Sequence, residues 1–399
     1  MVEKILIACC TLLLFGACGP PPPPPGPSLD HADLLLAEGR LQEAETELDR
    51  VLAANLPGER DRGHIRRGCL RVERGDARGA LADLNLVFRL DQHGQACLGR
   101  AQALLANHAE ALAQLIPLVE GGTFDPEVGR LAVQSSLSLR RISEALHIAE
   151  LAARKHPSDV PTLALLAQTQ AVTGDPQKAL KTLQGAARID GKSPEVPFIR
   201  GNIYWAMEKF DEAAKDYRTA LELNPAFAEA ARNLGIALIQ GGRYEDAVSA
   251  LRTALDLAPD DLGVMNNLGV ALATTGRAAQ AATLYEEARK SQPDEPRLLN
   301  NLVDVYIHLG RLDEARELLR LLVEKAPQRA NATQRLRDLE SFEVLLGFLC
   351  QGEGAVKEAT KQLKTRQWSH REIVESLERV LSDTIFTETL EQKEQECTK

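Results

Sequence analysis

The sequence is poor in aromatic residues and contains none of the short motifs that mark common catalytic sites. Phe, Trp and Tyr make up 4% of its 399 residues, too few for a large globular core. None of its eight histidines stands in HExxH, and neither GxSxG nor GxxxxGK followed by Ser or Thr occurs. No CxxC pair is present, so cysteine spacing does not support a zinc site. We therefore predict a non-enzymatic protein without cofactor or metal.

The chain also lacks an excess of basic residues. It carries 47 Lys and Arg against 57 Asp and Glu, a formal net charge of −10. Binding to nucleic acid calls for a basic face, so this balance argues against a nucleic-acid partner. The simpler interpretation of the negative charge is solubility.

Residues 1–18 are predicted to be a lipoprotein signal peptide that takes no part in the fold. Lys4 precedes an apolar run of 13 residues from Ile5 to Ala17, shorter than the ~20 that a membrane-spanning helix needs. The run ends in Phe15-Gly16-Ala17-Cys18, which resembles a bacterial lipobox. A simple secretory peptide is the alternative, although its cleavage requires a small residue where Phe15 stands.

The lipobox resemblance implies that Cys18 is the lipidated N-terminus of the mature protein. Gly19 after this cysteine favours, by the same resemblance, the outer membrane facing the periplasm. Residues 19–28 then form a Pro-rich spacer, since polyproline extends by about 3.1 Å per residue. A PxxP docking motif is the functional alternative for this tract.

A fixed period organises the stretch from Pro194 to Pro327. Four prolines stand 34 residues apart, and four alanines keep the same interval twelve residues before them: Pro225, Pro259, Pro293 and Pro327, with Ala213, Ala247, Ala281 and Ala315. Each period contains two amphipathic helical patterns, separated in one case by Gly241-Gly242. Such a helix pair must stack on its neighbours to bury its apolar faces.

These repeats resemble the tetratricopeptide repeat family, whose pattern is a Leu-Gly, an aromatic residue, alanines and a terminal proline. The second-helix alanines continue backwards through Ala179, Ala145, Ala111, Ala80 and Ala44, with one interval of 31 residues (Ala80 to Ala111) and one of 36 (Ala44 to Ala80). The resemblance implies an all-α solenoid of about nine helix-turn-helix repeats over residues 29–329, irregular over 29–159 and regular over 160–329. Residues 330–399 are predicted to form a C-terminal helical cap and tail.

Two helices are expected within that cap. One is predicted over Ala332–Cys350, and a second is predicted to start at Ser369, where Glu372 completes a capping box. Residues Trp368–Phe386 have two interpretations, a second cap or a partner-binding amphipathic helix, and we favour the cap.

The family resemblance also implies a groove lined by the first helices. The sixth repeat position holds Asn233, Asn267 and Asn301, called here the asparagine row. It resembles the asparagine ladder of O-linked N-acetylglucosamine transferase-type repeats, in which side-chain amides pair with an extended peptide backbone. The alternative is that Asn-Leu-Gly is only part of the repeat consensus. Further peptide-groove candidates on the same helical face are Asn202, Trp205, Arg232, Asn266, Asn300 and Asp304.

A second groove chemistry known in the family is a clamp for two carboxylates. It needs a cation beside the asparagines, but Phe198 and Gly263 stand where lysines are required. We therefore reject this mode.

Cys69 and Cys97 fall on the first helices of adjacent repeats. A disulfide is possible in an oxidising compartment, while two buried thiols are the interpretation we favour. His93 stands four residues before Cys97 and is interpreted as part of a polar turn.

These features together predict a lipid-anchored periplasmic scaffold that binds extended polypeptide in its groove. By family precedent such a protein assists assembly of an envelope complex: a secretin, pilus, gliding or outer-membrane machine. The alternative is a regulatory subunit or adaptor for a peptidoglycan-modifying enzyme. The expected partners are a protein or peptide and, through the lipid anchor, the membrane.

Overall fold

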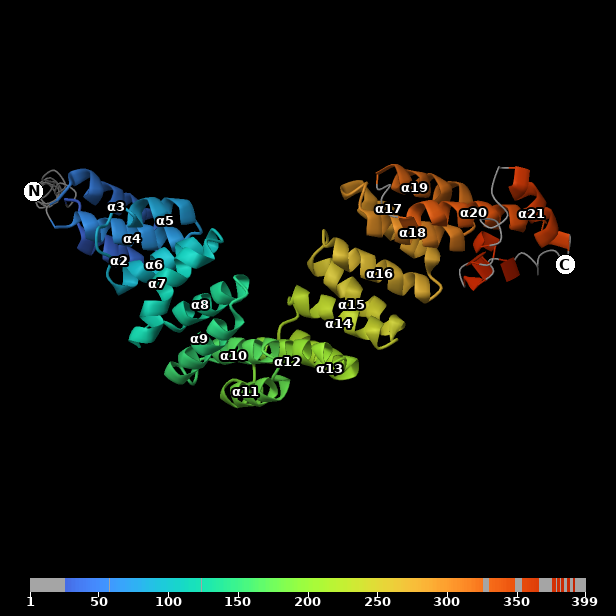
Figure 1. The fold of residues 1–399 in the computed structure, drawn as a ribbon. Coiled ribbons are helices and arrows are strands. Elements are labelled where there is room, and N and C mark those ends of the chain that lie inside the picture. The colour runs from blue at the N-terminus through green and yellow to red at the C-terminus, as the bar shows by residue number, and fades with distance from the viewer. Residues whose placement is uncertain are drawn as a thin grey trace, which may run out of the picture. The chain divides into compact units, whose positions relative to one another are not determined.

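The computed structural model describes residues 26–325 except 57 and 123, then 330–348, 354–365 and scattered positions between 375 and 391. The predicted signal peptide, Cys18, Pro327 and the capping box of Ser369 and Glu372 lie outside these residues. Within the described residues every regular element is a helix (Figure 1). The chain divides into two compact units between Thr182 and Leu183.

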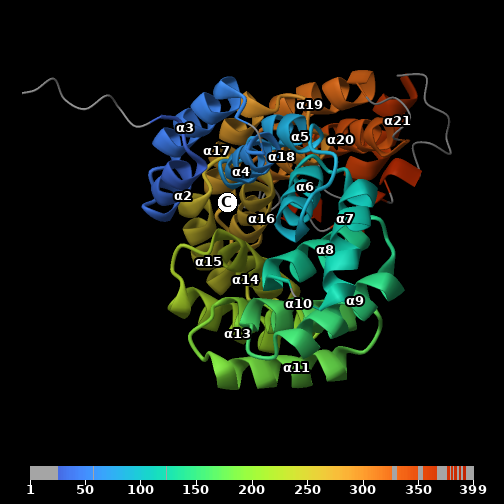
Figure 2. The same cartoon turned by 90° about the vertical axis from the view of Figure 1, so that its left-hand side faces the viewer.

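The first unit is built from consecutive antiparallel helix pairs (Figure 2). The pairs are α2 (Leu29–Ala37) with α3 (Leu41–Ala54), α4 (Arg60–Glu73) with α5 (Ala77–Leu84), α6 (Gln92–Leu104) with α7 (His108–Gly121), and α8 (Pro126–Ser138) with α9 (Ile142–Lys155). A fifth pair follows, α10 (Val160–Val172) with α11 (Pro176–Ile189), and the division between the units falls within α11.

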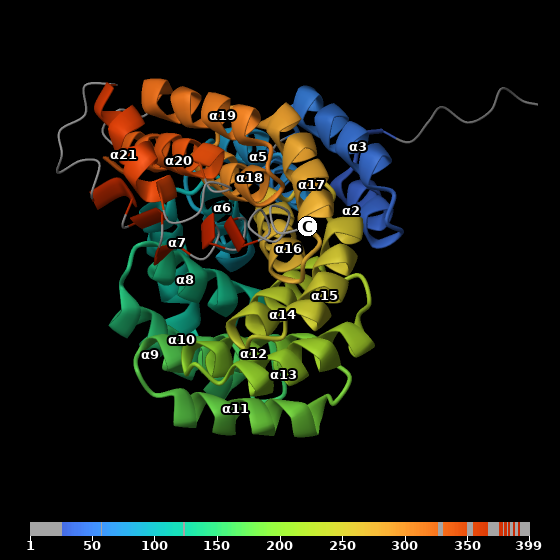
Figure 3. The same cartoon turned by 90° about the vertical axis from the view of Figure 1, so that its right-hand side faces the viewer.

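The second unit continues the same pattern and ends in two further helices (Figure 3). Its pairs are α12 (Glu195–Ala206) with α13 (Phe210–Leu223), α14 (Ala228–Gln240) with α15 (Tyr244–Leu257), α16 (Leu262–Thr274) with α17 (Ala278–Ser291), and α18 (Pro296–His308) with α19 (Leu312–Lys325). They are followed by α20 (Ala330–Phe348) and α21 (Ala355–Thr365). Nine pairs over the described residues confirm the predicted solenoid of helix-turn-helix repeats.

The second helix of every pair is anchored by one buried alanine. All nine are 0% exposed: Ala44, Ala80, Ala111, Ala145, Ala179, Ala213, Ala247, Ala281 and Ala315. Because the side chain of alanine is a single methyl group, two helix backbones can approach closely at this position. The periodic prolines follow the second helices: α13, α15 and α17 each end two residues before one, as expected of a residue that cannot continue a helix.

A glycine on the first helix makes room for a large side chain on the second. A Cβ at Gly201 would lie 2.8 Å from Tyr217, one at Gly235 would lie 2.4 Å from Leu251, and one at Gly269 would lie 2.2 Å from Tyr285. Real Cβ atoms do not approach so closely, so the side chain of the second helix fills the volume that glycine leaves empty.

The turn inside each pair needs one residue in the left-handed backbone region. Gly242 has φ +73° after α14, and Glu208 has φ +59° at the same place after α12. Glycine adopts this conformation freely, whereas a residue with a Cβ is strained there. The same turn therefore forms with glycine after α14 and with glutamate after α12.

One carboxylate is buried inside the first unit and neutralised there. Asp83 is 1% exposed. Its oxygens accept hydrogen bonds from Arg67 at 2.5 and 2.9 Å and from Arg71 at 2.7 Å, and His64 Nδ1 lies 3.0 Å away. These contacts join α4 to α5 through charge rather than through apolar packing. Desolvation acts to raise the pKa of Asp83, but the bonds from Arg67 and His64 outweigh it and hold the pKa below its usual value.

Helix α20 covers the apolar end of the last repeat. Leu339, Phe342 and Leu345 are buried in the same hydrophobic cluster as α18 and α19. The rings of Phe342 and Phe386 lie 4.7 Å apart, and Val380 is buried in this cluster too. The described part of Trp368–Phe386 thus packs as a cap would. No helix among the described residues has both the length and the apolar character required to cross a membrane.

Candidate functional site

The predicted groove residues lie on the first helices of the second unit. Asn202 and Trp205 are on α12, Asn233 is on α14, and Asn267 is on α16. The remaining candidates are Arg232 on α14, Asn266 on α16, and Asn300, Asn301 and Asp304 on α18. Because each pair repeats the same turn and packing, these helices present the same face to one side of the unit.

The first group of amides joins α12 to α14. Asn233 Nδ2 donates a hydrogen bond to Asn202 Oδ1 at 3.2 Å, and the hydroxyl of Tyr217 donates to the same oxygen at 2.8 Å. Burial raises the pKa of Tyr217 above its ordinary range, which keeps the phenol a hydrogen-bond donor. Both amides are therefore held in place by contacts within the protein.

A pocket of 280 Å³ opens beside these amides. It is lined by Asn202, Trp205, Tyr217, Asn233 and Ile236. Trp205 lines the pocket and is 43% exposed, so a large part of its ring is accessible from solvent. The pocket thus combines apolar surface with the two amides.

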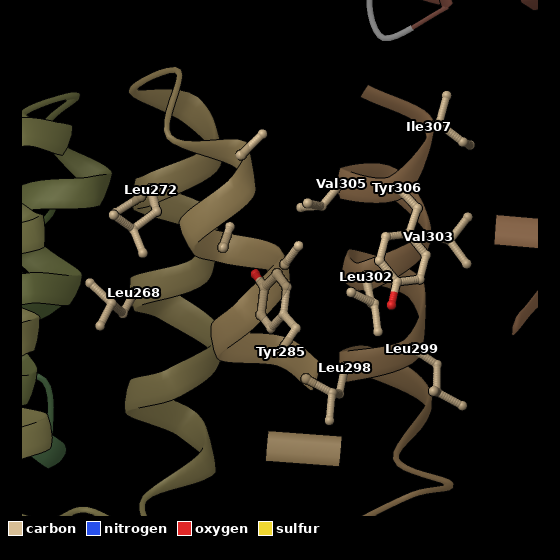
Figure 4. Close-up of a cluster of buried hydrophobic side chains, with 14 of the residues drawn as sticks. Leu268, Leu272, Tyr285, Leu298, Leu299, Leu302, Val303, Val305, Tyr306 and Ile307 are labelled. Atoms are coloured by element: carbon tan, nitrogen blue, oxygen red, sulfur yellow. The ribbon is translucent and has the colours of Figure 1, made fainter. Parts of the chain in front are cut away.

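The second group joins α16 to α18. Asn301 Nδ2 donates to Asn266 Oδ1 at 2.6 Å, and the Tyr285 hydroxyl donates to the backbone oxygen of Asn266 at 3.1 Å. Burial raises the pKa of Tyr285 above its ordinary range. Figure 4 shows the Tyr285 ring pointing into the space between the helix that carries Leu268 and the helix that carries Leu298.

Asn267 differs from the other two members of the asparagine row in its hydrogen bonding. Among the residues that the structure describes, no hydrogen bond holds its side-chain amide. It lines a pocket of 340 Å³ with Leu262, Gly263, Asn266, Gln292, Glu295, Arg297 and Leu298. Gly263 leaves space in the wall, because a Cβ there would meet only Asp261 Oδ1, at 3.1 Å.

Arg232 is already engaged at the side of this surface. Its NH1 lies 3.3 Å from Asp261 Oδ2, and its NH2 lies 4.0 Å from Glu229. Asp261 also accepts a hydrogen bond from Val264 N and so caps α16. Arg232 thus links α14 to the start of α16.

Asn300 and Asp304 are covered by α20. Arg335 on α20 donates to Asn300 Oδ1 at 2.8 Å and pairs with the carboxylate of Asp304. Asn300 Nδ2 donates to Pro296 O at 2.8 Å, so both ends of this amide are engaged. The accessible amides therefore lie on α12, α14 and α16. Of the three candidates on α18, only Asn301 is not bound by Arg335.

Sequence reasoning missed three residues of this site. Tyr217 and Tyr285 stand 68 residues apart, two periods of the repeat, and this spacing signals their common role. Arg335 lies beyond the last repeat, so no period links it to Asn300 and Asp304.

In the first unit the structure settles the question about the cysteines. Cys69 on α4 and Cys97 on α6 form a disulfide with Cα atoms 5.2 Å apart, so the favoured interpretation as free thiols is wrong. His93 lies within α6 rather than in a turn, and its Nε2 is 3.9 Å from Cys97 Sγ. Cys69, His93 and Cys97 are also the one group of possible metal ligands found close together among the described residues.

Three models of the tetratricopeptide repeat match the chain. They cover residues 25–50, 200–261 and 272–337. The stretch 200–261 contains Asn202 and Asn233, and the stretch 272–337 contains Asn300 and Asn301, whereas Asn266 and Asn267 lie between the two.

One curated relative is tetratricopeptide repeat protein 7B of Homo sapiens. It is 29% identical over 156 residues, which is 37% of this chain but only 18% of that protein. The match therefore concerns a small part of the relative.

Solved structures of two repeat proteins are also similar. YrrB, described as a TPR protein with an unusual peptide-binding site, is 19% identical, covers 46% of this chain and 95% of its own, and superposes with a TM-score of 0.42. The C-terminal part of a TPR repeat-containing protein from Cytophaga hutchinsonii is 16% identical, covers 60% of this chain and 98% of its own, and gives a TM-score of 0.48.

Proposed function

The chain belongs to the tetratricopeptide repeat family, and on this premise we propose that it is a lipid-anchored scaffold of the cell envelope that binds extended polypeptide. The fold supports a protein–protein interaction scaffold with protein or peptide partners. The finer parts of the proposal are the binding surface over α12–α16, the anchor and the envelope complex.

The uncommitted amide of Asn267 carries the binding proposal. An amide offers a donor and an acceptor together, so it satisfies both polar atoms of one peptide group without reading a side chain. Asn267 stands at the wall of the 340 Å³ pocket, where Leu262 and Leu298 supply apolar surface for a neighbouring side chain of the ligand.

The other amides have a supporting role in this proposal. Asn202 and Asn233 bond to each other, as do Asn266 and Asn301, so each pair is rigid before a ligand arrives. A preorganised surface loses less conformational entropy on binding. Each amide still has unused hydrogen-bonding capacity, because Oδ1 accepts two bonds and Nδ2 donates two.

The anchor and the compartment rest on the sequence. Lys4, the apolar run and Cys18 follow the lipoprotein pattern, and the Pro-rich spacer over residues 19–28 would separate the first repeat from the membrane surface. Assembly of a secretin, pilus, gliding or outer-membrane machine is the role we propose for the scaffold.

The binding surface is tested with an array of immobilised peptides of random sequence, probed with the full chain. Asn267→Ala removes the amide, and Gly263→Arg fills the adjoining pocket. We expect each change to lower the affinity for the bound peptides about tenfold, or by ~1.4 kcal/mol of binding free energy. The matched control is Gln280→Ala, which removes an exposed amide that bonds to Arg252 on the second-helix side.

Unchanged binding by both variants would refute the groove. Loss of binding in Gln280→Ala to the same degree would show a general loss of folding instead. The triple variant Asn233→Ala, Asn267→Ala, Asn301→Ala tests the whole asparagine row in the same assay.

Partner class and anchor need separate measurements. Co-purification from solubilised envelopes that recovers secretin or barrel subunits supports the assembly role, whereas recovery of peptidoglycan-modifying enzymes supports an adaptor role. Metabolic labelling with a palmitate analogue should mark the wild-type chain and not Cys18→Ser. Equal labelling of both would contradict the anchor.

A further inference from the structure

Two cysteines and one histidine of the first unit converge at the contact between α4 and α6. Their possible ligand atoms, Cys69 Sγ, His93 Nε2 and Cys97 Sγ, all lie within 4.8 Å of one another. Cys69 is 6% and Cys97 3% exposed, while His93 is exposed at the surface. From this arrangement we infer that reduction of the Cys69–Cys97 disulfide creates a binding site for a borderline-soft divalent metal ion such as Zn²⁺.

Helix geometry places two of the ligands. His93 and Cys97 are four residues apart on α6, so their side chains project from one face of the helix. Cys97 Sγ lies 3.9 Å from His93 Nε2. Bond lengths of roughly 2.3 Å to sulfur and 2.0–2.1 Å to nitrogen put tetrahedral ligands about 3.5 Å apart, so this edge needs only a small adjustment.

The third ligand comes from the neighbouring helix. Cys69 on α4 faces Cys97 across 5.2 Å between Cα atoms. In the oxidised chain both sulfur atoms share a covalent bond and no thiolate is available. Reduction lets the sulfurs move apart to the ~3.8 Å of a tetrahedral site, with water as the fourth ligand. The exposed imidazole lies at the entry path.

The chemistry balances with a reductant of the dithiol or phosphine class. A phosphine and one water cleave the S–S bond, giving two thiols and the phosphine oxide. The metal ion then displaces both thiol protons to solvent and binds two thiolates and the neutral imidazole. Two thiolates neutralise the charge of the ion, which makes its burial at this helix contact favourable.

The test uses the full chain with the other cysteines replaced by serine: Cys9, Cys10, Cys18, Cys350 and Cys397. This protein is reduced with a phosphine under anaerobic conditions and titrated with Co²⁺, a spectroscopic probe for Zn²⁺ sites. Alkylation before and after reduction counts the free thiols. Circular dichroism of the reduced protein checks that the helices remain.

The reduced protein should bind one equivalent of Co²⁺ with thiolate-to-cobalt charge-transfer absorption, and Zn²⁺ should abolish the signal. The oxidised protein should give no such absorption. Cys97→Ser should lose it, and His93→Ala should weaken Co²⁺ binding at least about tenfold. His147→Ala, an exposed histidine on α9, is the matched control and should bind as the parent does.

Absence of the absorption in the reduced, folded protein would overturn the inference. Unfolding on reduction would overturn it too, because the site requires α4 and α6 in contact. Equal affinity in His93→Ala would reduce the finding to binding by two thiols alone and would remove the histidine ligand from the site.

Discussion

The side-chain amide of Asn301 donates to Oδ1 of Asn266 at 2.6 Å, from α18 to α16. The bond joins the sixth position of one repeat to the fifth position of the preceding one. Asn233 also donates to an amide of the preceding repeat, but its partner Asn202 stands 31 residues earlier, about one helical turn further along the first helix than Asn266 does in its repeat. The amides of neighbouring repeats therefore bond in pairs, and Asn267 is left to face the pocket.

We predict an energetic coupling between Asn266 and Asn301. Asn266→Ala, Asn301→Ala and the double variant form a cycle on the stability of the full chain in urea. A hydrogen bond of this kind should give a coupling of about 1 kcal/mol. The control cycle pairs Asn267→Ala with Asn301→Ala and should be additive. Equal coupling in both cycles would contradict a specific bond.

The 34-residue period predicts the fold far better than it predicts this site. It places the second-helix alanines from Ala111 to Ala315 at equal intervals, because a repeat that stacks on itself must bury the same position each time, while Ala80 and Ala44 follow at intervals of 31 and 36 residues. The angle between successive first helices decides which amides form hydrogen bonds with each other. The spacing of residues along the chain does not determine that angle. Asn301 therefore bonds to Asn266 rather than to Asn267.

The end of the groove was beyond sequence reasoning for another reason. Arg335 covers Asn300 and Asp304 from α20, where the period has stopped. The disulfide is a similar case: helix positions put Cys69 and Cys97 on adjacent first helices, but only packing brings their Cα atoms to 5.2 Å.

The contact between Gly235 and Leu251 predicts that this glycine tolerates no side chain. Gly235→Ala would place a Cβ 2.4 Å from Leu251 Cγ, and we expect the free energy of unfolding to fall by about 1–3 kcal/mol. Gly185→Ala is the control, because a Cβ at this position of α11 would meet nothing within 4 Å, and it should not lower the free energy of unfolding. Adding Leu251→Ala to Gly235→Ala should cost less than the two changes summed. Strict additivity would argue against a steric cause.

The left-handed turn residues predict a stabilising substitution. Glu208 has φ +59° where the next repeat has Gly242 at φ +73°. Glu208→Gly should raise the free energy of unfolding by about 1 kcal/mol, and Gly242→Ala should lower it by a similar amount. Gly241→Ala is the control, since Gly241 has φ −79°. Thermal unfolding of the full chain measures all three. A destabilised Glu208→Gly would show that contacts of the glutamate side chain outweigh the backbone strain at this turn.

The buried carboxylate of Asp83 predicts how the first unit responds to acid. Its pKa is lower in the folded chain than in the unfolded one, so the stability it contributes is present above the unfolded value of about 3.9 and is lost as pH falls through the folded value. Asp83→Asn should cost about 3 kcal/mol near neutral pH, because Arg67 and Arg71 lose their buried partner.

The same variant should lose less stability than the wild type as pH falls below about 4, since it has no proton to take up at this position. Glu73→Gln, at the exposed end of α4, should follow the wild-type pH dependence. Urea unfolding of the full chain at several pH values, followed by circular dichroism, gives the comparison. Parallel pH profiles for Asp83→Asn and the wild type would mean that this carboxylate does not link the folding of α4 and α5 to protonation.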